Sequence, residues 1–517
     1  MNNKLSSSLF IALIVSLGGF VFGFDASVIS GVVSFVAVEF NLTDWQQGFV
    51  VSSPTLGAAI ASLVAGTLSD RVGRKKVLLG IAFLYVLSAI CSALATSYYM
   101  LVSARFIGGL AFASLILAPI YIAEISPAER RGKMISFNQF NIVIGLSAAY
   151  FANYFILNLA QSDIAWVTNL GINDNVWRWM LGLEIIPASI FFIALMFVPE
   201  SPRFLAMNGQ REKAKEVLER LHGKVAMQRE LAEIDSAPHK REARVIDSVK
   251  QLFSKNMRLV LTIGLVVAIA QQITGVNAIY FYAPSIFEQS GVGTNAAFAQ
   301  AIWVGIINVI FTIVAMVLID KIGRKPLLVV GLTGVFLSMS LCYYGFSNAT
   351  YQLTEKNVAQ ISLPAETLAP VLNQQYNDDL AFKDALKQTL GEKTFKANEA
   401  ELIQSAINID STLVLMGILG FVASFAVSLG PVMWVLLAEI FPNHLRGIAI
   451  SFVGVVNSGI SFTVQLVFPW ELSNFGTALT FLIYGLFAVV GLVLVLWLLP
   501  ETKGKTLEQI EQDLVPA

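Results

Sequence analysis

Seven consecutive residues, Gln271-Gln272-Ile273-Thr274-Gly275-Val276-Asn277, place three side-chain amides in the middle of an apolar stretch of membrane length. Amides donate and accept hydrogen bonds and carry no charge, so they suit a neutral polyhydroxylated ligand better than an ion. Because an unpaired amide in hydrocarbon is costly, we expect these side chains to face a polar cavity, with the helix loosened at Gly275. The alternative is that the amides hydrogen-bond neighbouring helices together.

Asp25 is a second polar residue at membrane depth, in the first apolar stretch and without a local counter-charge. A carboxylate there is costly unless it is paired or protonated, and such residues commonly serve as ion or proton sites. Arg105, in the fourth apolar stretch, is the expected partner. A carboxylate whose partner comes and goes can take up and release a proton, whereas a permanent pair would be purely structural. Glu184, in the sixth stretch, is a further candidate for this site.

Trp434 follows Gly430-Pro431, where a proline can break the surrounding helix. An aromatic face beside amide groups can stack on the apolar C–H face of a sugar ring. The alternative is that Trp434 belongs to the aromatic belt at the membrane interface.

Short charged motifs occur twice along the chain. Asp70-Arg71-Val72-Gly73-Arg74-Lys75 returns as Asp320-Lys321-Ile322-Gly323-Arg324-Lys325, and Pro199-Glu200 returns as Pro500-Glu501. We expect a helix to end at Asp70, a turn at Gly73 and ion pairs to neighbouring helices, which together would latch two halves of the protein in one state and release them in the other. Simple anchoring by the positive-inside rule is the alternative, but it does not explain the repeated acids. The predicted network comprises Asp70, Arg71, Arg74, Glu124, Arg131, Glu200, Asp320, Arg324, Glu439, Arg446 and Glu501.

The composition predicts a polytopic membrane protein, since 56% of the 517 residues are hydrophobic and only 13% are charged. About 20 apolar residues span a bilayer as a helix. On that rule the sequence predicts an all-α membrane protein with twelve transmembrane helices in two six-helix pseudo-symmetric halves. The predicted spans are 8–36, 47–68, 77–96, 99–123, 134–157, 178–198, 259–287, 298–319, 327–347, 411–438, 447–470 and 477–499.

Basic residues concentrate in alternate connections between the spans, which by the positive-inside rule places both termini in the cytoplasm. The predicted division is an N-terminal half (1–200), a cytoplasmic linker with short helices (201–258), a C-terminal half (259–500) and a cytoplasmic tail (501–517). The polar insert 348–410 lies on the outer side, and two alternatives are open for it: a small helical cap, or partial disorder.

Other functional classes lack support in the sequence. The net charge of −1 gives no reason to expect a nucleic-acid partner. Cys91 and Cys342 lie in apolar runs without a partner motif, and the histidines lack ligand spacing, so we expect neither a disulfide nor a metal site. No nucleophile, metal or phosphate-binding constellation indicates an enzyme, and no cofactor is expected. The first apolar run lacks a credible cleavage site and is predicted to be the first span.

Several ordered motifs together resemble the sugar porter branch of the major facilitator superfamily, and within it the bacterial proton-coupled xylose symporters. The resemblance covers nearly the whole chain apart from the insert 348–410. It rests on residues 70–76, 105–109, 119–132, 199–203, 271–277, 320–326, 430–447 and 500–504.

The resemblance implies roles for individual residues. Sugar contacts are implied for Gln139, Gln271, Gln272, Asn277, Asn308 and Trp434, with Asn457 supplying the amide of the eleventh span. Proton coupling is implied for Asp25 opposed by Arg105, with Glu184. The chain departs from the symporters at Ser458, where they have tryptophan, at Phe281, where they have tyrosine, and in a fourth span one residue shorter between Arg105 and Glu124.

The predicted function is import of a monosaccharide, pentose or hexose, by alternating access coupled to proton symport. The alternatives are a facilitative uniporter and a sugar sensor that does not transport. We expect a monomer in the lipid bilayer of a bacterial inner (cytoplasmic) membrane, with a small-molecule sugar and a proton as its partners.

Overall fold

The computed structural model describes residues 2–127, 130–224, 227–229, 231, 245–358, 361–442, 445–505 and 507–514. Parts of the predicted linker (225–226, 230 and 232–244) and of the predicted tail (506 and 515–517) lie outside the described residues. So do His239 and His444. Within the described residues the chain is almost entirely helical.

The described residues include 11 helical stretches that are long and apolar enough to cross a membrane. The last of them is broken at Gly476, where φ is 77° and ψ is 166°, so it supplies two spans. With that break counted, the described residues contain the twelve spans that the sequence predicts. The stretches are Ser8–Gly31, Asp44–Val72, Arg74–Ala93, Tyr98–Ile125, Arg131–Ala160, Val176–Met196, Lys255–Gln289, Thr294–Ile322, Arg324–Ser347, Ser411–Ile440 and Arg446–Leu498.

The chain forms two compact units, and unit 1 comprises Met1–Val28, Ser53–Ala152 and Asp163–Ala243. Two long helices, α3 (Asp44–Val72) and α7 (Arg131–Ala160), begin or end in the other unit. The described residues of unit 1 also form α1 (Asn2–Val28), α4 (Arg74–Ala93), α5 (Tyr98–Ala111), α6 (Ser114–Ile125), α8 (Ala165–Asn169), α9 (Val176–Gly182), α10 (Ile185–Met196), α11 (Pro202–Met207) and α12 (Arg211–His222).

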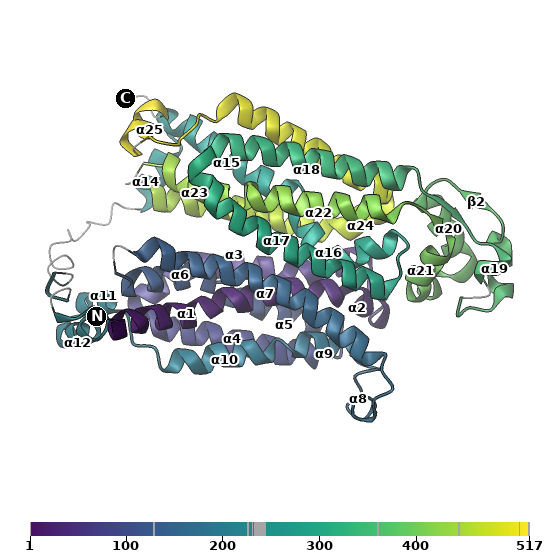
Figure 1. The fold of residues 1–517 in the computed structure, drawn as a ribbon, viewed down its shortest axis with the longest axis horizontal. Helices are drawn as coiled ribbons and strands as arrows, with labels where there is room; N and C mark the ends of the chain where they lie inside the picture. Colours follow the sequence, from purple (N-terminus) through teal and green to yellow (C-terminus); the bar gives the residue numbers. More distant parts are fainter. Residues whose placement is uncertain are drawn as a thin grey trace. The chain divides into compact units, whose positions relative to one another are not determined.

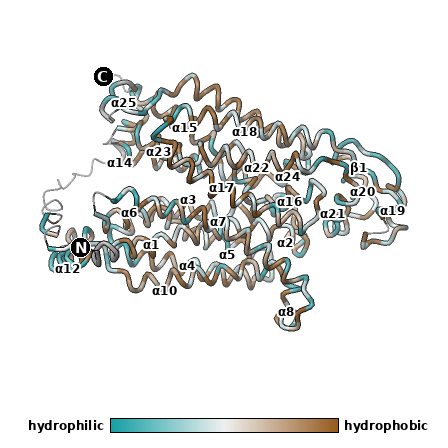
Figure 2. The backbone as a smooth tube through the Cα atoms, viewed as in Figure 1, coloured by the Kyte–Doolittle hydropathy of each residue, from teal (hydrophilic) through white to brown (hydrophobic). Residues whose placement is uncertain are grey.

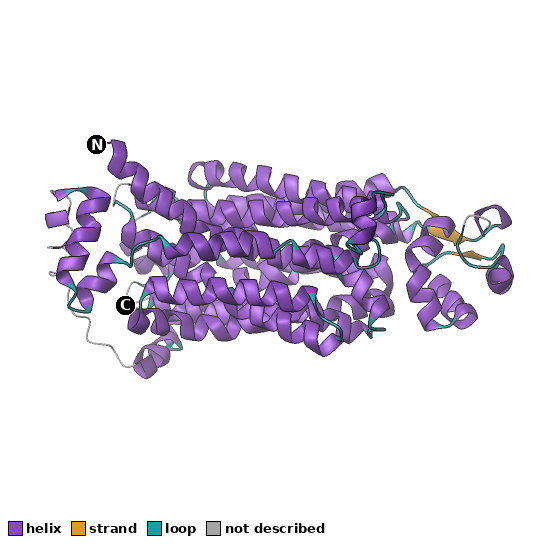
Figure 3. Ribbon diagram, turned by 90° about the horizontal axis from the view of Figure 1, so that it is seen from below, coloured by secondary structure: helices purple, strands orange, loops and turns teal. Residues whose placement is uncertain are grey.

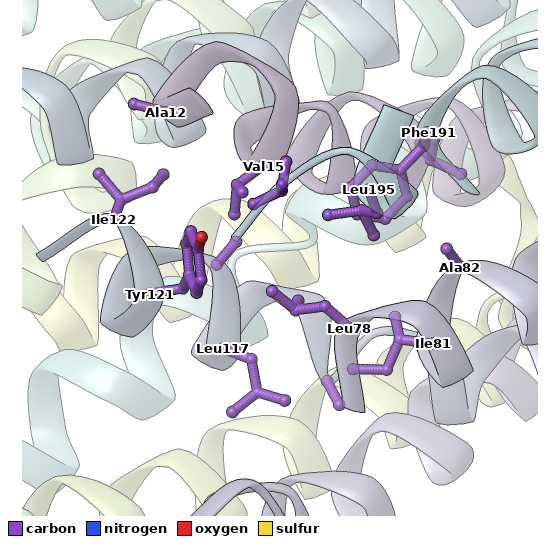
Figure 4. Packing of buried hydrophobic residues seen from close by; sticks show 14 of the residues in the cluster. Ala12, Val15, Leu78, Ile81, Ala82, Leu117, Tyr121, Ile122, Phe191 and Leu195 are labelled. Carbon is purple, nitrogen blue, oxygen red and sulfur yellow. The ribbon is translucent and has the colours of Figure 1, made fainter. Parts of the chain in front are cut away.

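The interior of unit 1 is a continuous cluster of apolar side chains from α1, α4, α6 and α10 (Figure 4). Val15, Leu78, Leu117 and Leu195 are completely buried in it. Tyr121 also lies there, and its hydroxyl donates a hydrogen bond to the Pro199 carbonyl oxygen at 2.6 Å. Since lipid is as apolar as leucine, close van der Waals packing rather than removal from water holds such a bundle together.

Unit 2 comprises Ile29–Ser52, Asn153–Ser162 and Arg244–Ala517. Its helices are η1 (Ile29–Gly31), α2 (Val33–Glu39), α14 (Val245–Leu252), η3 (Lys255–Met257), α15 (Arg258–Ile273), α16 (Val276–Gln289), α17 (Thr294–Ile322), α18 (Arg324–Ser347), α22 (Ser411–Val427), α23 (Leu429–Ile440), α24 (Arg446–Leu498) and α25 (Leu507–Leu514).

The seventh span is broken where the amide-rich stretch predicts it. Helix α15 ends at Ile273, Gly275 adopts a left-handed φ of 90°, and α16 starts at Val276. A Cβ atom at position 275 would lie 2.8 Å from the Tyr484 ring, so both the backbone angle and the space require glycine. A second kink occurs at Tyr282, two residues before Pro284. The predicted loosening of the helix at Gly275 is therefore confirmed.

The insert 348–410 is a small folded cap at one end of the unit 2 helices (Figure 1), more hydrophilic than the spans (Figure 2). Besides helices it contains an antiparallel three-stranded sheet of order β2-β1-β3 (Figure 3), which the sequence does not predict. It has its own apolar core around Phe382, Leu386 and Phe395. Its elements are β1 (Thr350–Gln352), α19 (Glu355–Val358), η4 (Ala365–Val371), β2 (Gln375–Tyr376), α20 (Asp379–Leu390), α21 (Glu392–Ala406) and β3 (Ile407–Asn408).

Candidate functional site

The amides of the broken seventh span form one hydrogen-bonded cluster in unit 2. Gln271 donates to the Leu429 carbonyl oxygen at 3.0 Å, and Gln272 donates to Asn457 Oδ1 at 3.1 Å. Asn277 donates to Gln272 Oε1 at 2.7 Å. The break at Gly275 separates the helix that supplies the two glutamines from the helix that supplies Asn277. The amides thus hydrogen-bond neighbouring helices together, as the alternative predicts, and that they also face a polar cavity stays a prediction.

Two members of this cluster were missed by sequence reasoning. Ser461 Oγ accepts from Asn277 Nδ2 at 2.6 Å and from Gln465 Nε2 at 2.9 Å. The Gln465 carbonyl oxygen accepts from the Tyr282 hydroxyl at 3.1 Å. Asn457, Ser461 and Gln465 are spaced four residues apart in α24, so they lie on one helix face. That spacing of polar residues in an apolar span was the pattern that could have identified them.

The remaining predicted sugar contacts are placed as follows. Asn308, on α17, is buried, and its Oδ1 accepts from the Tyr280 hydroxyl at 3.2 Å. Trp434, on α23 of unit 2, is 49% exposed. Gln139 is exposed on α7 in unit 1. Asn308 thus connects to the seventh span, whereas the side chains of Gln139 and Trp434 are exposed.

Asp25 and Arg105 form an ion pair inside unit 1, through Asp25 Oδ1 and Arg105 Nη1. Both residues are almost completely buried. Gly108 permits the close packing around them, because a Cβ atom there would lie 2.5 Å from Ser88 Oγ and 2.9 Å from Asp25 Oδ2. The pair forms even though the span is interrupted at Phe112 and Ala113, between α5 and α6.

Glu184 is buried beside this pair, close enough to interact electrostatically with both Asp25 and Arg105. Among the described residues, three polar atoms here lack a hydrogen-bond partner: Asp25 Oδ2, Arg105 Nε and Glu184 Oε1. The structure therefore brings together the three residues that the sequence singled out for proton coupling. An unpaired carboxylate oxygen in a buried setting is chemically suited to accept a proton.

The charged motif of unit 1 forms a dense network. Arg74 binds both carboxylate oxygens of Glu124, with Nε to Oε2 at 3.1 Å and Nη2 to Oε1 at 3.2 Å, and it also pairs with Asp70 at 2.7 Å. Glu200 Oε1 accepts from the Lys75 backbone N–H at 3.0 Å. The prediction that the helix ends at Asp70 is wrong by two residues. It continues to Val72, because the break needs the φ of 110° that Gly73 adopts.

In unit 2 the corresponding residues also pair, but both contacts of Arg324 with Glu439, from Nε and Nη2, go to the single oxygen Oε1. Arg324 contacts Glu439 Oε1 through Nη2 at 2.7 Å and pairs with Asp320 at 3.2 Å. Glu501 accepts from the backbone N–H groups of Arg324 and Lys325, at 3.1 and 3.0 Å. Corresponding residues thus pair in both repeats, although the individual hydrogen bonds differ.

Three arginines of the predicted network lie outside these bonds. Arg71 and Arg131 are exposed, and neither forms an ion pair with another described residue. Arg446 donates from Nε to the Phe441 carbonyl oxygen at 3.3 Å. The sequence places these three arginines near the acids but does not show which of the basic residues bind them.

The chain matches the family described as "Sugar (and other) transporter" over residues 11–365 and 395–514. It belongs to this sugar transporter family. The unmatched interval, 366–394, falls inside the insert 348–410. This transporter is a multi-pass membrane protein and, as the sequence predicts, a transporter rather than an enzyme.

Known relatives of the transporter cover almost its full length. It is 33% identical over 512 residues to an arabinose-proton symporter of Bacillus subtilis strain 168, covering 99% of this chain and 96% of that protein. It is also 33% identical over 550 residues to the D-xylose-proton symporter of Escherichia coli K12, covering 99% of this chain and 97% of that protein.

Solved structures show the same architecture. The inward open conformation of the xylose transporter XylE from E. coli matches with a TM-score of 0.73 and 30% identity, covering 98% of this chain and 100% of that one. A structure of the major facilitator superfamily proton:xylose symporter XylE bound to 6-bromo-6-deoxy-D-glucose matches with a TM-score of 0.66 and 31% identity, covering 99% of this chain and 100% of that one. These matches confirm the predicted major facilitator fold.

Proposed function

We propose that this transporter imports a monosaccharide, pentose or hexose, by alternating access in symport with a proton. The observation on which this depends is the coexistence of two polar sites at membrane depth: an uncharged amide cluster at a helix break, and a buried carboxylate paired with an arginine. The names of its relatives, which include arabinose-proton and D-xylose-proton symporters, support the same conclusion.

The sugar is proposed to bind through uncharged groups. Amides suit hydroxyl groups, which both donate and accept, and an indole face suits the apolar C–H surface of a sugar ring. The proposed contacts are Gln139, Gln271, Gln272, Asn277, Asn308, Trp434 and Asn457.

The proton is proposed to bind Asp25 when Arg105 moves away, with Glu184 contributing to the local field. A carboxylate that loses its cation in an apolar setting is stabilised by protonation, so proton uptake and the conformational change become linked. A fixed Asp25–Arg105 pair would give uniport instead.

The two charged motifs are proposed to latch the two six-span halves, 1–200 and 259–500, which the segment 201–258 would connect. Arg74 and Arg324 are each held by acids of their own repeat. Rearrangement of such bonds between two packed states is a recognised route to switching. We further propose a monomer in the inner membrane, with both termini and the tail 501–517 in the cytoplasm.

The test is sugar-induced alkalinisation of the medium by energy-depleted cells that express the protein, with pentoses and hexoses offered one at a time. We expect the medium pH to rise for the transported sugar, and Asp25→Asn to abolish the rise while sugar exchange persists. Asp163→Asn, which changes an exposed carboxylate in a loop, is the matched control and should behave as wild type.

Two other results would contradict proton-coupled sugar transport. Sugar entry without any change in medium pH would make the protein a uniporter and reduce Asp25 to a structural ion pair. Binding of a sugar by the purified protein with no uptake by cells would indicate a sensor.

A further inference from the structure

Backbone carbonyl groups fix the orientation of the amides in unit 2. Gln271 Nε2 lies 3.0 Å from the Leu429 carbonyl oxygen, and Asn457 Nδ2 lies 2.9 Å from the Ala268 carbonyl oxygen. A carbonyl oxygen can only accept, so each of these amides must turn its nitrogen toward the backbone. Their oxygen atoms therefore point toward the other side chains of the cluster, from which they accept hydrogen bonds.

The orientation of each amide determines the orientation of the amide that it contacts. Gln271 Oε1 accepts from Asn457 Nδ2 at 3.0 Å and from Gln272 Nε2 at 3.2 Å. Gln272 Nε2 also donates to Asn457 Oδ1 at 3.1 Å, so the Gln272 oxygen must face Asn277, from whose Nδ2 it accepts at 2.7 Å. Asn277 Nδ2 donates a second bond to Ser461 Oγ at 2.6 Å.

The N–H groups of four amides, those of Gln271, Gln272, Asn277 and Asn457, are consequently all engaged. A side-chain amide has two N–H donors. Those of Gln272, Asn277 and Asn457 are engaged as described, and Gln271 uses its second on the Gly430 carbonyl oxygen at 3.4 Å. What the amides of Gln272 and Asn277 still offer a ligand is acceptor capacity: Asn277 Oδ1 has no partner in the described part of the chain, and Gln272 Oε1 accepts one bond of the two it can accept. These two residues are half-buried, whereas Gln271 and Asn457 are buried.

We propose that Gln272 and Asn277 form a hydrogen-bond acceptor surface, which selects ligands whose hydroxyl groups donate to it. This rests on the proposed function, since it concerns how the same site recognises a sugar. A hydroxyl facing the surface must donate, because an oxygen that only accepted would meet another acceptor. In the structure Asn308 Oδ1 accepts from the Tyr280 hydroxyl, which leaves the Asn308 N–H groups to donate; because a hydroxyl can also accept, no backbone carbonyl fixes this amide as one fixes Gln271 or Asn457. The site therefore distinguishes hydroxyl positions by the direction of their hydrogen bonds.

Deoxyfluoro sugars test the direction directly, because fluorine accepts weakly and cannot donate. We would measure binding to the purified full-length protein of D-glucose and D-xylose and of their deoxy and deoxyfluoro analogues at carbons 2, 3 and 4. At one or more positions the deoxyfluoro sugar should bind as weakly as the deoxy sugar, each about three- to ten-fold more weakly than the parent. Deoxyfluoro sugars that bind as tightly as the parent at every position would overturn the acceptor surface and leave the proposed function intact. Failure of both parent sugars to bind would overturn the proposed function, and the inference with it.

Ser461→Ala provides a second test, because it removes one acceptor of Asn277 and frees an N–H group for the ligand. At the position where fluorine is not tolerated in the wild type, the variant should bind the deoxyfluoro sugar about three-fold or more tightly relative to the deoxy sugar. Ser451→Ala is the matched control on the same helix, since that hydroxyl is exposed and donates only to the Gly447 carbonyl oxygen at 2.9 Å. An equal shift in both variants, or in neither, would contradict the inference. If Ser461→Ala fails to fold, the binding of the deoxy and deoxyfluoro sugars to the wild-type protein is by itself the test of the acceptor surface.

Discussion

Arg105 and Arg74 bind their carboxylates in different ways. Arg74 engages both oxygens of Glu124, which gives a strong and geometrically fixed pair. Arg105 contacts Asp25 through Nη1, which also donates to the Asp25 backbone carbonyl oxygen at 3.3 Å. Its Nε and Asp25 Oδ2 lack partners among the described residues. A pair made through one nitrogen has fewer bonds to break in the proposed exchange of Arg105 for a proton.

Because the Asp25–Arg105 pair is buried, we expect its loss to lower the stability of the folded protein. Arg105→Met leaves the Asp25 carboxylate buried without its cation, and such losses cost about 3 kcal/mol or more. We expect a clearly lower Tm for the purified variant in detergent, and recovery of most of the loss in the Asp25→Asn/Arg105→Met double variant, in which no charge is left unpaired. Arg203→Met, at an exposed arginine, should change the Tm little. A double variant no more stable than Arg105→Met would show that packing, rather than charge, dominates at this position.

At the scale of elements, the break between α15 and α16 determines where the amide cluster lies. Gly275→Ala would place a Cβ atom on a left-handed backbone and 2.8 Å from the Tyr484 ring. The left-handed backbone conformation alone costs an alanine about 1 kcal/mol or more. We expect a lower Tm together with weaker sugar binding, because relief of the strain must rotate Asn277 relative to Gln272.

The control for that substitution is Gly459→Ala. Gly459 lies in α24 with nothing within 4 Å of the added Cβ atom, so this change should leave the Tm and sugar binding unchanged or slightly raise the Tm. A Gly275→Ala protein as stable as Gly459→Ala would mean that the seventh span can be continuous without penalty.

The insert 348–410 is coupled to the hairpin between the last two spans through Asp379. Its Oδ2 accepts from the Thr477 backbone N–H at 2.9 Å and from the Thr477 hydroxyl at 2.7 Å, directly after the break at Gly476. A carboxylate in this position caps the start of a helix, and loss of a cap costs about 1 kcal/mol. Asp379→Ala should therefore lower the Tm measurably. Asp384→Ala, in the same helix but 68% exposed in its side chain, is expected to have no effect. Equal Tm values for the two variants would show that Asp379 does not stabilise the protein by capping this helix.

The sequence predicts some elements well and others poorly, for physical reasons. Long apolar runs specify spans, and Gly275 beside polar residues specifies a break, because both effects are local. The strands of the insert are only two or three residues long, too short for an alternating pattern to be recognised. Ser461 belongs to the amide cluster only because α24 packs against the seventh span, a contact between segments 184 residues apart in sequence. Such pairings depend on tertiary packing, which local pattern does not encode.

At the scale of the whole chain, segments 29–52 and 153–162 precede residue 200 yet pack within unit 2. Gln161 and Asn295 exchange reciprocal amide hydrogen bonds of 2.9 and 2.7 Å. Gly48 approaches Leu466 so closely that a Cβ atom would lie 2.0 Å from its carbonyl oxygen. These contacts join ends of the first six spans to the last six. Alternating access requires that contacts of this kind open in one state and close in another.

The contact between Ser34 and Ser285 allows that requirement to be tested. The two hydroxyl oxygens lie 3.0 Å apart, from α2 and α16, so cysteines at both positions would place their sulfur atoms close enough to be bridged. Oxidation of the Ser34→Cys/Ser285→Cys variant should abolish sugar uptake, because the bridge holds closed a contact that must open, and a reducing agent should restore uptake. Each single-cysteine variant under the same oxidant is the control, and the native Cys91 and Cys342, which are free, remain in all the proteins. A variant that is fully bridged by mass spectrometry and still transports at the wild-type rate would show that this contact stays closed throughout the cycle, so that the ligand must enter elsewhere.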